Sequence, residues 1–98
     1  FIKVGGIGMP VNGFAWHERE MPPGSEELAC AYRPWCLHAI EAFGPQRCMF
    51  ESNFPVDKVS YSYHVMYNAF KLLSKGYSAS ERAAMLHDTA AGVYRIDV

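Results

Sequence analysis

The stretch Met49–Lys58, MFESNFPVDK, decides how the chain is interpreted. It opens with apolar residues, as a buried parallel strand does, and it runs to a proline at position 55, which cannot donate to a strand ladder. Glu51 and Asn53 nevertheless stand directly before that proline. Polar groups are costly in a buried strand unless they are paired or take part in the function. The rest of the chain therefore has to explain why these two residues are polar.

The residues before this stretch predict a strand, a loop and a long helix. FIKVGGIGM, at 1–9, has a β-branched core that ends in glycines. SEELACAYRPWCLHAIEAFG, at 25–44, has apolar residues at helical spacing, with Ser25 as a candidate N-cap and Gly44 as a candidate C-cap. Pro34 predicts a kink or the start of a second helix. A strand, a helix and the strand of RCMFESNFP describe a parallel βαβ crossover.

The residues after it predict helices only. VSYSYHVMYNAFKLLSKG, at 59–76, carries apolar residues along one helical side, and Ser78 with Glu81 forms a capping box that opens the next helix. Two strands alone cannot make a stable parallel sheet. Since the chain also begins inside a strand without methionine, we expect that residues 1–98 are part of a larger domain whose other strands lie upstream.

Composition excludes several classes of protein. A net charge of −1 over 98 residues gives no basic surface for nucleic acid or an anionic membrane. No apolar run or charged leader suggests a membrane span or a secretory signal, so we expect a soluble, cytoplasmic protein. The cysteines are three in number, without Cys-x-x-Cys spacing, and we expect them to be small buried side chains: Cys30, Cys36 and Cys48.

The alternation of side chains gives the two strands matching faces. Met49, Glu51 and Asn53 share one face of the second strand, and Lys3 with Gly5 shares one face of the first. If the strands are neighbours, Lys3 and Glu51 are expected to form an ion pair that offsets the cost of burying either charge. The other interpretation gives Glu51 a role in binding or proton transfer.

Three stretches together, FIKVGGIGM at 1–9, RCMFESNFPVDK at 47–58 and TAAGVYRI at 89–96, resemble the C-terminal end of the amidohydrolase-related family. That family includes metal-dependent and metal-independent hydrolases and decarboxylases, among them sugar lactonases. The resemblance implies an α/β fold, in which this chain is the C-terminal portion of a (β/α)8 TIM barrel: about the last two βα units plus the terminal helices.

The resemblance places the catalytic candidates at the end of the second strand. Relatives usually carry an aspartate where this chain has Asn53, and that aspartate binds a metal or activates water. An amide keeps the shape but cannot accept a proton at neutral pH and is a poorer ligand for a divalent cation. Three alternatives follow: Asn53 orients substrate while Glu51, Asp57 or His17 takes the proton; upstream residues do the chemistry; or the activity has been lost.

The loop after the first strand supplies the candidates for substrate binding. Trp16, His17 and Arg19 lie in a long Gly- and Pro-rich segment, where Arg19 could meet a carboxylate and Trp16 could cover an apolar face. The alternative is a solvated loop anchored by its tryptophan. Asp57, after the second strand, is predicted either to reach substrate or to cap the next helix.

The expected function is that of a hydrolase that adds water to a lactone, amide or similar carbonyl compound at the C-terminal mouth of the barrel. The alternatives are a non-oxidative decarboxylase and an inactive homologue that binds a ligand. A divalent metal such as zinc is expected to be bound mainly by residues outside this chain, and a metal-free mechanism is the other option. The expected partners are a small-molecule substrate and the upstream part of the barrel. Assembly into a homo-oligomer is left open.

Overall fold

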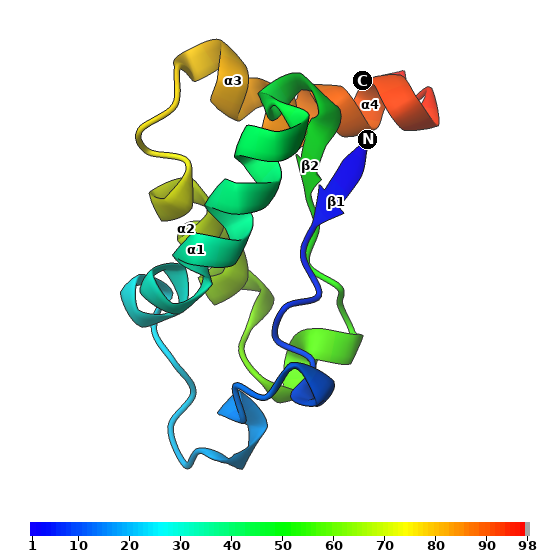
Figure 1. The fold of residues 1–98 in the computed structure, drawn as a ribbon. Helices are drawn as coiled ribbons and strands as arrows, with labels where there is room; N and C mark the ends of the chain where they lie inside the picture. The colour runs from blue at the N-terminus through cyan, green and yellow to red at the C-terminus, as the bar shows by residue number, and fades with distance from the viewer. Residues whose placement is uncertain (98) are drawn as a thin grey trace.

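The computed structural model describes residues 1–97, which form a small unit of helices and two strands (Figure 1). β1 (Ile2–Val4) is followed by a long loop and by α1 (Ser25–Phe43). β2 (Cys48–Phe50) then leads through a second loop into α2 (Tyr63–Leu73). The loops contain short 3-10 turns, which are η1 (Pro10–Asn12), η2 (Trp16–Glu18), η3 (Pro45–Arg47) and η4 (Val56–Val59).

The C-terminal part is helical, as predicted. It consists of α3 (Ala79–Ala83), the π-helical turn η5 (Ala84–Asp88) and α4 (Thr89–Tyr94). The capping box is confirmed, because Ser78 and Glu81 exchange hydrogen bonds at 2.9 and 3.2 Å between side chain and backbone. None of the helices in the described part of the chain is both long and apolar enough to cross a membrane.

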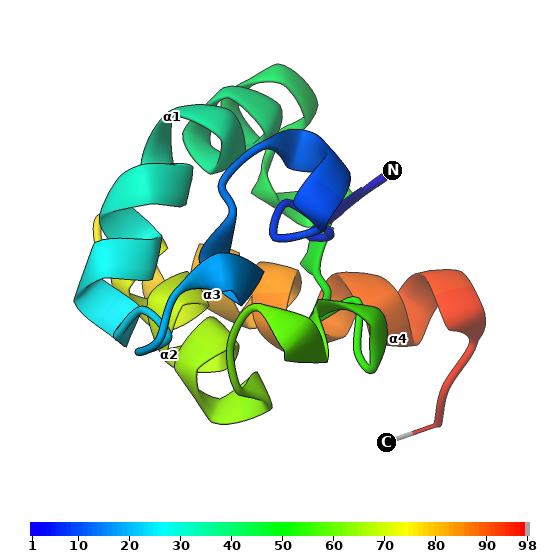
Figure 2. The same cartoon turned by 90° about the horizontal axis from the view of Figure 1, so that it is seen from below.

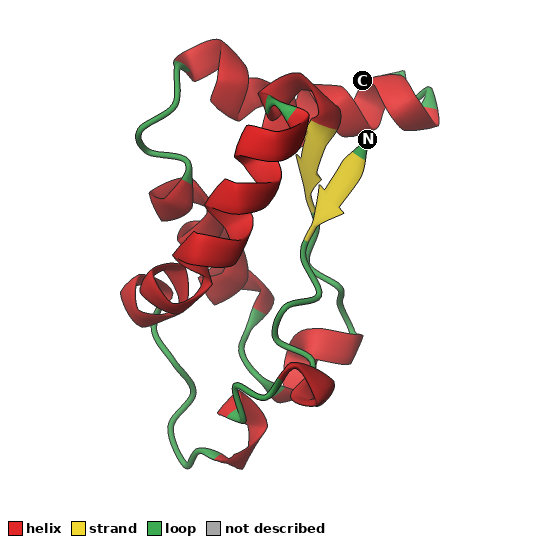
Figure 3. Ribbon diagram, in the orientation of Figure 1, coloured by secondary structure: helices red, strands yellow, loops and turns green. Residues whose placement is uncertain are grey.

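The two strands pair in parallel, with Ile2 opposite Cys48 and Val4 opposite Phe50. Both arrows therefore point the same way, and the loops that follow them run to the same end of the molecule (Figure 3). This confirms the βαβ crossover. The described residues do not close a barrel, so the observed structure is a small mixed unit of the kind that part of an α/β fold would form.

Helix α1 differs from the prediction at its start and in its middle. Gly24 is the N-cap, and the hydroxyl of Ser25 instead donates to the backbone oxygen of Val65 on α2, at 3.3 Å. The helix also runs through Pro34 as one element, which rules out the start of a second helix there, while a kink at Pro34 stays a prediction. Buried Tyr32 and Cys36 stand on either side of the proline, and their packing holds the helix together.

The core lies between the strands and the two long helices, which pack against each other. Phe50 of β2 stacks on Phe70 of α2 with ring centroids 4.3 Å apart. Cys36 and Cys48 are buried here, as expected, and burial raises the pKa of the Cys36 thiol to about 12. Cys30 is exposed on α1, so the prediction that it is buried was wrong.

The segment between β2 and α2 is less regular than predicted. β2 ends at Phe50 and does not extend to Pro55. Val59 and Tyr63, which were assigned to the apolar side of the next helix, are 60% and 54% exposed. Val59 lies outside the helix because α2 begins only after Ser62, whose hydroxyl accepts a hydrogen bond from the amide of Val65 at 3.2 Å, and Tyr63 is the first residue of that helix.

Candidate functional site

The carboxyl ends of β1 and β2 lie side by side, because the strands are parallel. The backbone amide of Glu51 donates to the carbonyl oxygen of Val4 at 3.1 Å, which continues the pairing one residue past β2. Gly5 lies directly against this point. A Cβ atom added to Gly5 would lie 2.7 Å from Oε1 of Glu51 and closer still to the Glu51 carbonyl oxygen. The absence of a side chain at position 5 thus makes room for the Glu51 carboxylate.

Asn53 is held by two carboxylates. Its backbone amide donates to Oε2 of Glu51 at 2.8 Å, and its side-chain Nδ2 donates to Oδ1 of Asp57 at 2.8 Å. Its φ of 57° lies in the left-handed region, which asparagine tolerates better than most residues. The side chain lies beside Gly6 at the end of β1. Asn53 is therefore fixed at the place where both strands end.

Asp57 is fully buried, and the chain itself occupies both of its carboxylate oxygens. Oδ1 accepts from Asn53, and Oδ2 accepts from the hydroxyl of Tyr61 at 2.9 Å. The predicted capping role is wrong, because Ser62 caps α2. The predicted contact between Asp57 and substrate stays a prediction, while the observed contacts make Asp57 a support for Asn53.

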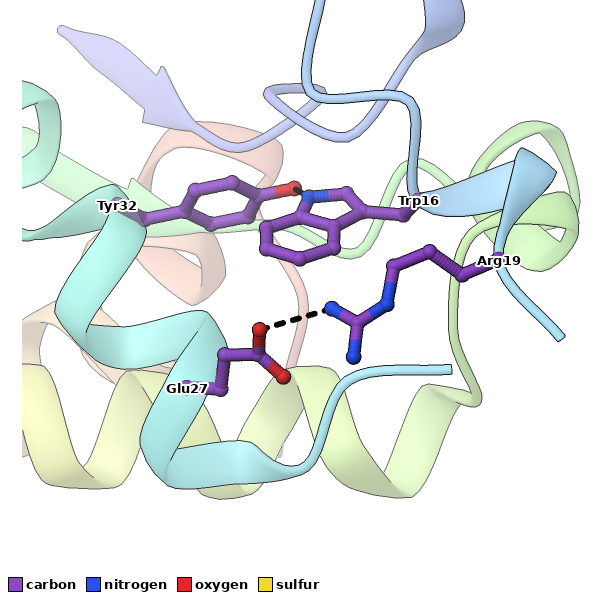
Figure 4. A network of polar contacts seen from close by, with 4 residues as sticks. All are labelled: Trp16, Arg19, Glu27 and Tyr32. Carbon is purple, nitrogen blue, oxygen red and sulfur yellow. Dashed lines mark hydrogen bonds and ion pairs between the residues drawn. The ribbon is translucent and has the colours of Figure 1, made fainter. Parts of the chain in front are cut away.

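A chain of hydrogen bonds continues from Asp57 to the loop after β1. The hydroxyl of Tyr32 donates to that of Tyr61 at 3.4 Å, and Nε1 of Trp16 donates to the hydroxyl of Tyr32 at 3.0 Å. Figure 4 shows the indole nitrogen meeting the Tyr32 hydroxyl. Burial raises the pKa of Tyr32 to about 12, and burial followed by the hydrogen bond with Tyr32 raises the pKa of Tyr61. Both hydroxyls are therefore neutral at ordinary pH.

Trp16 and Arg19, two predicted substrate-binding residues, have partners within the chain. Trp16 is only 8% exposed and stacks on Phe14. The guanidinium carbon of Arg19 lies 5.3 Å from the centroid of the Trp16 ring, and its Nη1 donates to Oε2 of Glu27 on α1 at 2.8 Å (Figure 4). These contacts anchor the loop to α1. A role of either residue in substrate binding stays a prediction.

His17 lies in the 3-10 turn η2, next to Trp16. Its Nε2 is 3.9 Å from Oε1 of Glu18, and about a third of its side chain is exposed (33%). The structure does not bring His17 into contact with Glu51 or Asn53 through any hydrogen bond of the described residues. Its roles in substrate binding or proton transfer stay predictions.

Two clefts border the loops at the strand ends. Figure 2 shows the course of these loops from below. The first has a volume of about 360 Å³ and adjoins the end of β1; it is lined by Gly5, Gly6, Ile7, Asn12, Phe14 and Trp35. The second has a volume of about 320 Å³ and is lined in part by Trp16, Arg19 and Tyr61. Two of the loop residues predicted to bind substrate, Trp16 and Arg19, thus line the second cleft.

The prediction of an ion pair between Lys3 and Glu51 is wrong. The ion pairs of the described residues do not include it: these are His17–Glu18, Arg19–Glu27 and His87–Asp88. Lys3 lies opposite Met49, two residues before Glu51, and two residues of strand span roughly 7 Å. The Glu51 carboxylate instead binds the backbone amide of Asn53. The interpretation that gives Glu51 a role in binding or proton transfer is therefore the one left open.

The side chains of this chain do not fit a metal ion by themselves. Among residues 1–97 no group of three or more His, Cys, Asp or Glu side chains could hold one. Asp57 is buried with both oxygens occupied, and Asn53 offers only a neutral amide oxygen. Of the polar groups at the strand ends, the described residues thus leave Glu51 and Asn53 available to such a centre.

The sequence interpretation missed Tyr32 and Tyr61. Tyr32 belongs to the apolar residues at helical spacing within 25–44, and nothing in that pattern assigns a role to its hydroxyl or to Tyr61. One signal was available: Asn53, Asp57 and Tyr61 follow one another at intervals of four, the spacing that brings side chains together along a helical turn. Backbone hydrogen bonds at the same interval hold this geometry: the amide of Asp57 donates to the Asn53 carbonyl oxygen at 3.0 Å, and the amide of Tyr61 donates to that of Asp57 at 3.4 Å.

Comparison with known proteins identifies the family. The model of a family described as amidohydrolase matches residues 11–96. A similar protein is "Uncharacterized protein y4mH" from Sinorhizobium fredii (strain NBRC 101917 / NGR234), which is 45% identical over 94 residues. The matched region covers 96% of this chain and 27% of that relative. The chain thus spans about a quarter of the length of that relative. No solved structure matches the chain. The chain belongs to the amidohydrolase family.

Proposed function

We propose that this chain forms the end of a (β/α)8 barrel hydrolase, with β1 and β2 as its seventh and eighth strands, which adds water to a lactone, amide or similar carbonyl compound. The observation that carries the proposal is the position of Glu51 and Asn53 at the carboxyl end of β2, beside the end of β1. In barrels of this kind, the chemistry gathers at the carboxyl ends of the strands. Family membership supports a role of the hydrolase or decarboxylase type.

Glu51 and Asn53 have different roles in this proposal. Glu51 is the proton acceptor: Oε2 binds the amide of Asn53, and Oε1 has no hydrogen-bond partner among the described residues. Asn53 cannot take the proton, so it orients the attacking water or the substrate. Arg19, Trp16 and His17 contact the substrate from the loop after β1, which requires Arg19 to exchange its bond with Glu27 for a substrate carboxylate.

The metal requirement is part of the test, since residues 1–97 contain no group of three or more His, Cys, Asp or Glu side chains that could hold a metal ion. A divalent cation such as zinc would be bound mainly by residues of the upstream chain. In the alternative, the enzyme works without a metal. We also propose that the protein is cytoplasmic and that its partners are a small-molecule substrate and the remainder of the same barrel. Assembly into a homo-oligomer is left open.

The test uses the full-length protein that contains this chain. It is assayed against a panel of sugar lactones and simple amides, and against aromatic and unsaturated acids with detection of released CO2. Hydrolysis of a lactone or amide supports the proposal, and CO2 release favours the decarboxylase. Ligand binding without turnover favours the inactive homologue. Dialysis against a chelator, followed by return of zinc, decides whether the reaction needs a metal.

A second test addresses the proposal that the chain is part of a barrel. Two strands expose sheet edges that the upstream strands would cover. The 98-residue chain expressed alone is expected to catalyse nothing. Turnover by a cooperatively unfolding monomer of the chain would contradict this proposal.

A further inference from the structure

Two side chains, Asn53 and Tyr61, bind the Asp57 carboxylate, and two more, Tyr32 and Trp16, lead to it; their chemistry fixes the direction of every hydrogen bond. A carboxylate only accepts, so the group of Asn53 that lies 2.8 Å from Oδ1 has to be its NH2 group. For the same reason the hydroxyl of Tyr61, 2.9 Å from Oδ2, has to donate. Asp57 is fully buried, so water does not satisfy these groups in place of the protein.

The other end of the chain of bonds enforces the same direction. The indole nitrogen of Trp16 can only donate, so the hydroxyl of Tyr32 accepts from it at 3.0 Å. The hydroxyl hydrogen of Tyr32 is then free to donate to Tyr61 at 3.4 Å, and Tyr61 donates to Asp57. Reversing any one bond would leave a buried hydroxyl without an acceptor, which is costly.

We propose that Asp57, supported by Tyr61, is a positioning residue that turns the Asn53 amide so that its nitrogen faces inward and its carbonyl oxygen Oδ1 is presented at the strand end. This rests on the proposed function. Asn53 Oδ1 has no hydrogen-bond partner among the described residues, although Nδ2 and the backbone amide both have one. The strand end therefore offers an acceptor at position 53.

The proposal specifies what Asn53 binds. An amide oxygen accepts hydrogen bonds, so Asn53 orients a donor: the attacking water or a hydroxyl group of the substrate. One hydrogen of its NH2 group is bound to Asp57, so the group that Asn53 presents without a partner among the described residues is an acceptor, and an acceptor does not stabilise the developing oxyanion of the carbonyl group. In this respect Asn53 offers what a carboxylate would offer at the same place, without the capacity to take a proton.

The test compares four variants of the full-length protein. Asn53→Asp places two carboxylates in direct contact. Asp57→Asn keeps an acceptor for Tyr61 but turns a new NH2 group toward Asn53, so that the Asn53 amide has to invert. The double variant Asn53→Asp with Asp57→Asn exchanges the two groups and restores a donor–acceptor pair. Asp88→Asn makes the same chemical change at an exposed carboxylate on η5 that only contacts His87.

The expected order of thermal stability follows from the charges. Asn53→Asp should lower Tm by about 8 °C or more, since buried like charges are strongly unfavourable and a domain loses a few degrees per kcal/mol. Asp57→Asn and the exchanged pair should each remain within about 4 °C of the unaltered protein. Asp88→Asn should change nothing. Equal losses in Asn53→Asp and in the exchanged pair would overturn the proposed orientation.

Activity supplies the second readout. With the lactone or amide that the full-length protein hydrolyses, Asp57→Asn should lower kcat/KM about ten- to a hundredfold because Asn53 then presents a donor. The exchanged pair should recover at least part of this loss, because the new carboxylate at position 53 presents an acceptor again. If Asp57→Asn keeps full kcat/KM, the orientation of Asn53 does not matter and the inference fails. If no substrate of the proposed classes is hydrolysed, the proposed function fails, and the stability series still decides the orientation.

Discussion

The two strand ends contribute opposite things to the candidate site. After β1 come Gly5, Gly6 and Gly8, which bring no side chains, and after β2 come Glu51 and Asn53, which bring the polar groups. The glycines are needed where they stand: a Cβ at position 5 would collide with Glu51, and one at position 8 would lie 2.6 Å from the ring of Tyr61. One strand end therefore supplies space and the other supplies chemistry. The Glu51 carboxylate fits at this site because the neighbouring strand end has a glycine, without a side chain, at position 5.

The largest expected effect comes from filling the space after β1. Gly5→Ala should lower the free energy of unfolding by about 3 kcal/mol, since the added methyl group would meet the Glu51 backbone as well as its carboxylate. The measurement is urea unfolding of the full-length protein. Gly76→Ala is the control, because nothing lies within 4 Å of a Cβ there. Equal stability of the two variants would contradict the conclusion that the end of β1 has to leave space for Glu51.

The second prediction concerns the support beneath the polar end. Tyr61→Phe removes one of the two hydrogen bonds to the buried Asp57 and the acceptor of the Tyr32 hydroxyl. The free energy of unfolding should fall by about 2 to 3 kcal/mol, because buried charged groups are expensive to leave unpaired. Tyr94→Phe, at an exposed position of α4, is the matched control and should cost little. A cost below about 0.5 kcal/mol for Tyr61→Phe would mean that Asp57 is satisfied in some other way.

The third prediction concerns the polar end itself. Asn53→Ala removes the amide that orients water or substrate, which is worth about 1 to 3 kcal/mol of barrier, so kcat/KM should fall about ten- to a hundredfold. The assay uses the substrate of the full-length protein, with Asn68→Ala on α2 as control, whose side chain hydrogen-bonds to His64. If Asn53→Ala lowers Tm alone and leaves kcat/KM intact, the residue is structural.

The smallest effect is expected at the loop after β1. Arg19→Ala should lower the free energy of unfolding by about 1 kcal/mol or less, because its pair with Glu27 is exposed and its contact with Trp16 is a modest one. If Arg19 also meets a substrate carboxylate, KM should rise for acidic substrates and stay constant for neutral ones. Glu27→Gln separates the two roles, since it weakens the ion pair and leaves the arginine in place. A KM unchanged for both kinds of substrate would leave Arg19 as an anchor of the loop.

Sequence reasoning predicted the order of elements well because periodic patterns are local. The helix over Ser25–Phe43, the capping box at Ser78 and the parallel crossover were all legible in spacing and in turn chemistry. It placed Glu51 and Asn53 correctly at the end of β2, although the strand itself ends earlier. These features depend on a few neighbouring residues.

Two of the errors involve contacts between segments far apart in sequence. Side-chain alternation gave Lys3 and Glu51 the same face, but only the register of the two strands shows that they stand two residues apart. In the same way, Asp57 follows the second strand as a loop residue in the sequence, whereas in the structure it is fully buried and its partner Tyr61 is bonded in turn to Tyr32 of α1. Neither fact could be read from local patterns, since both depend on tertiary packing.

The two tryptophans stand in opposite surroundings, and this gives the chain a built-in optical probe. Trp16 is 8% exposed and bonded to Tyr32, whereas Trp35 is 61% exposed and lines the cleft beside Gly5 and Gly6. The fluorescence of an indole moves to shorter wavelength when it leaves water. Emission from Trp16 therefore reports whether the loop is docked on α1, and emission from Trp35 reports whether another part of the protein covers the open side of β1.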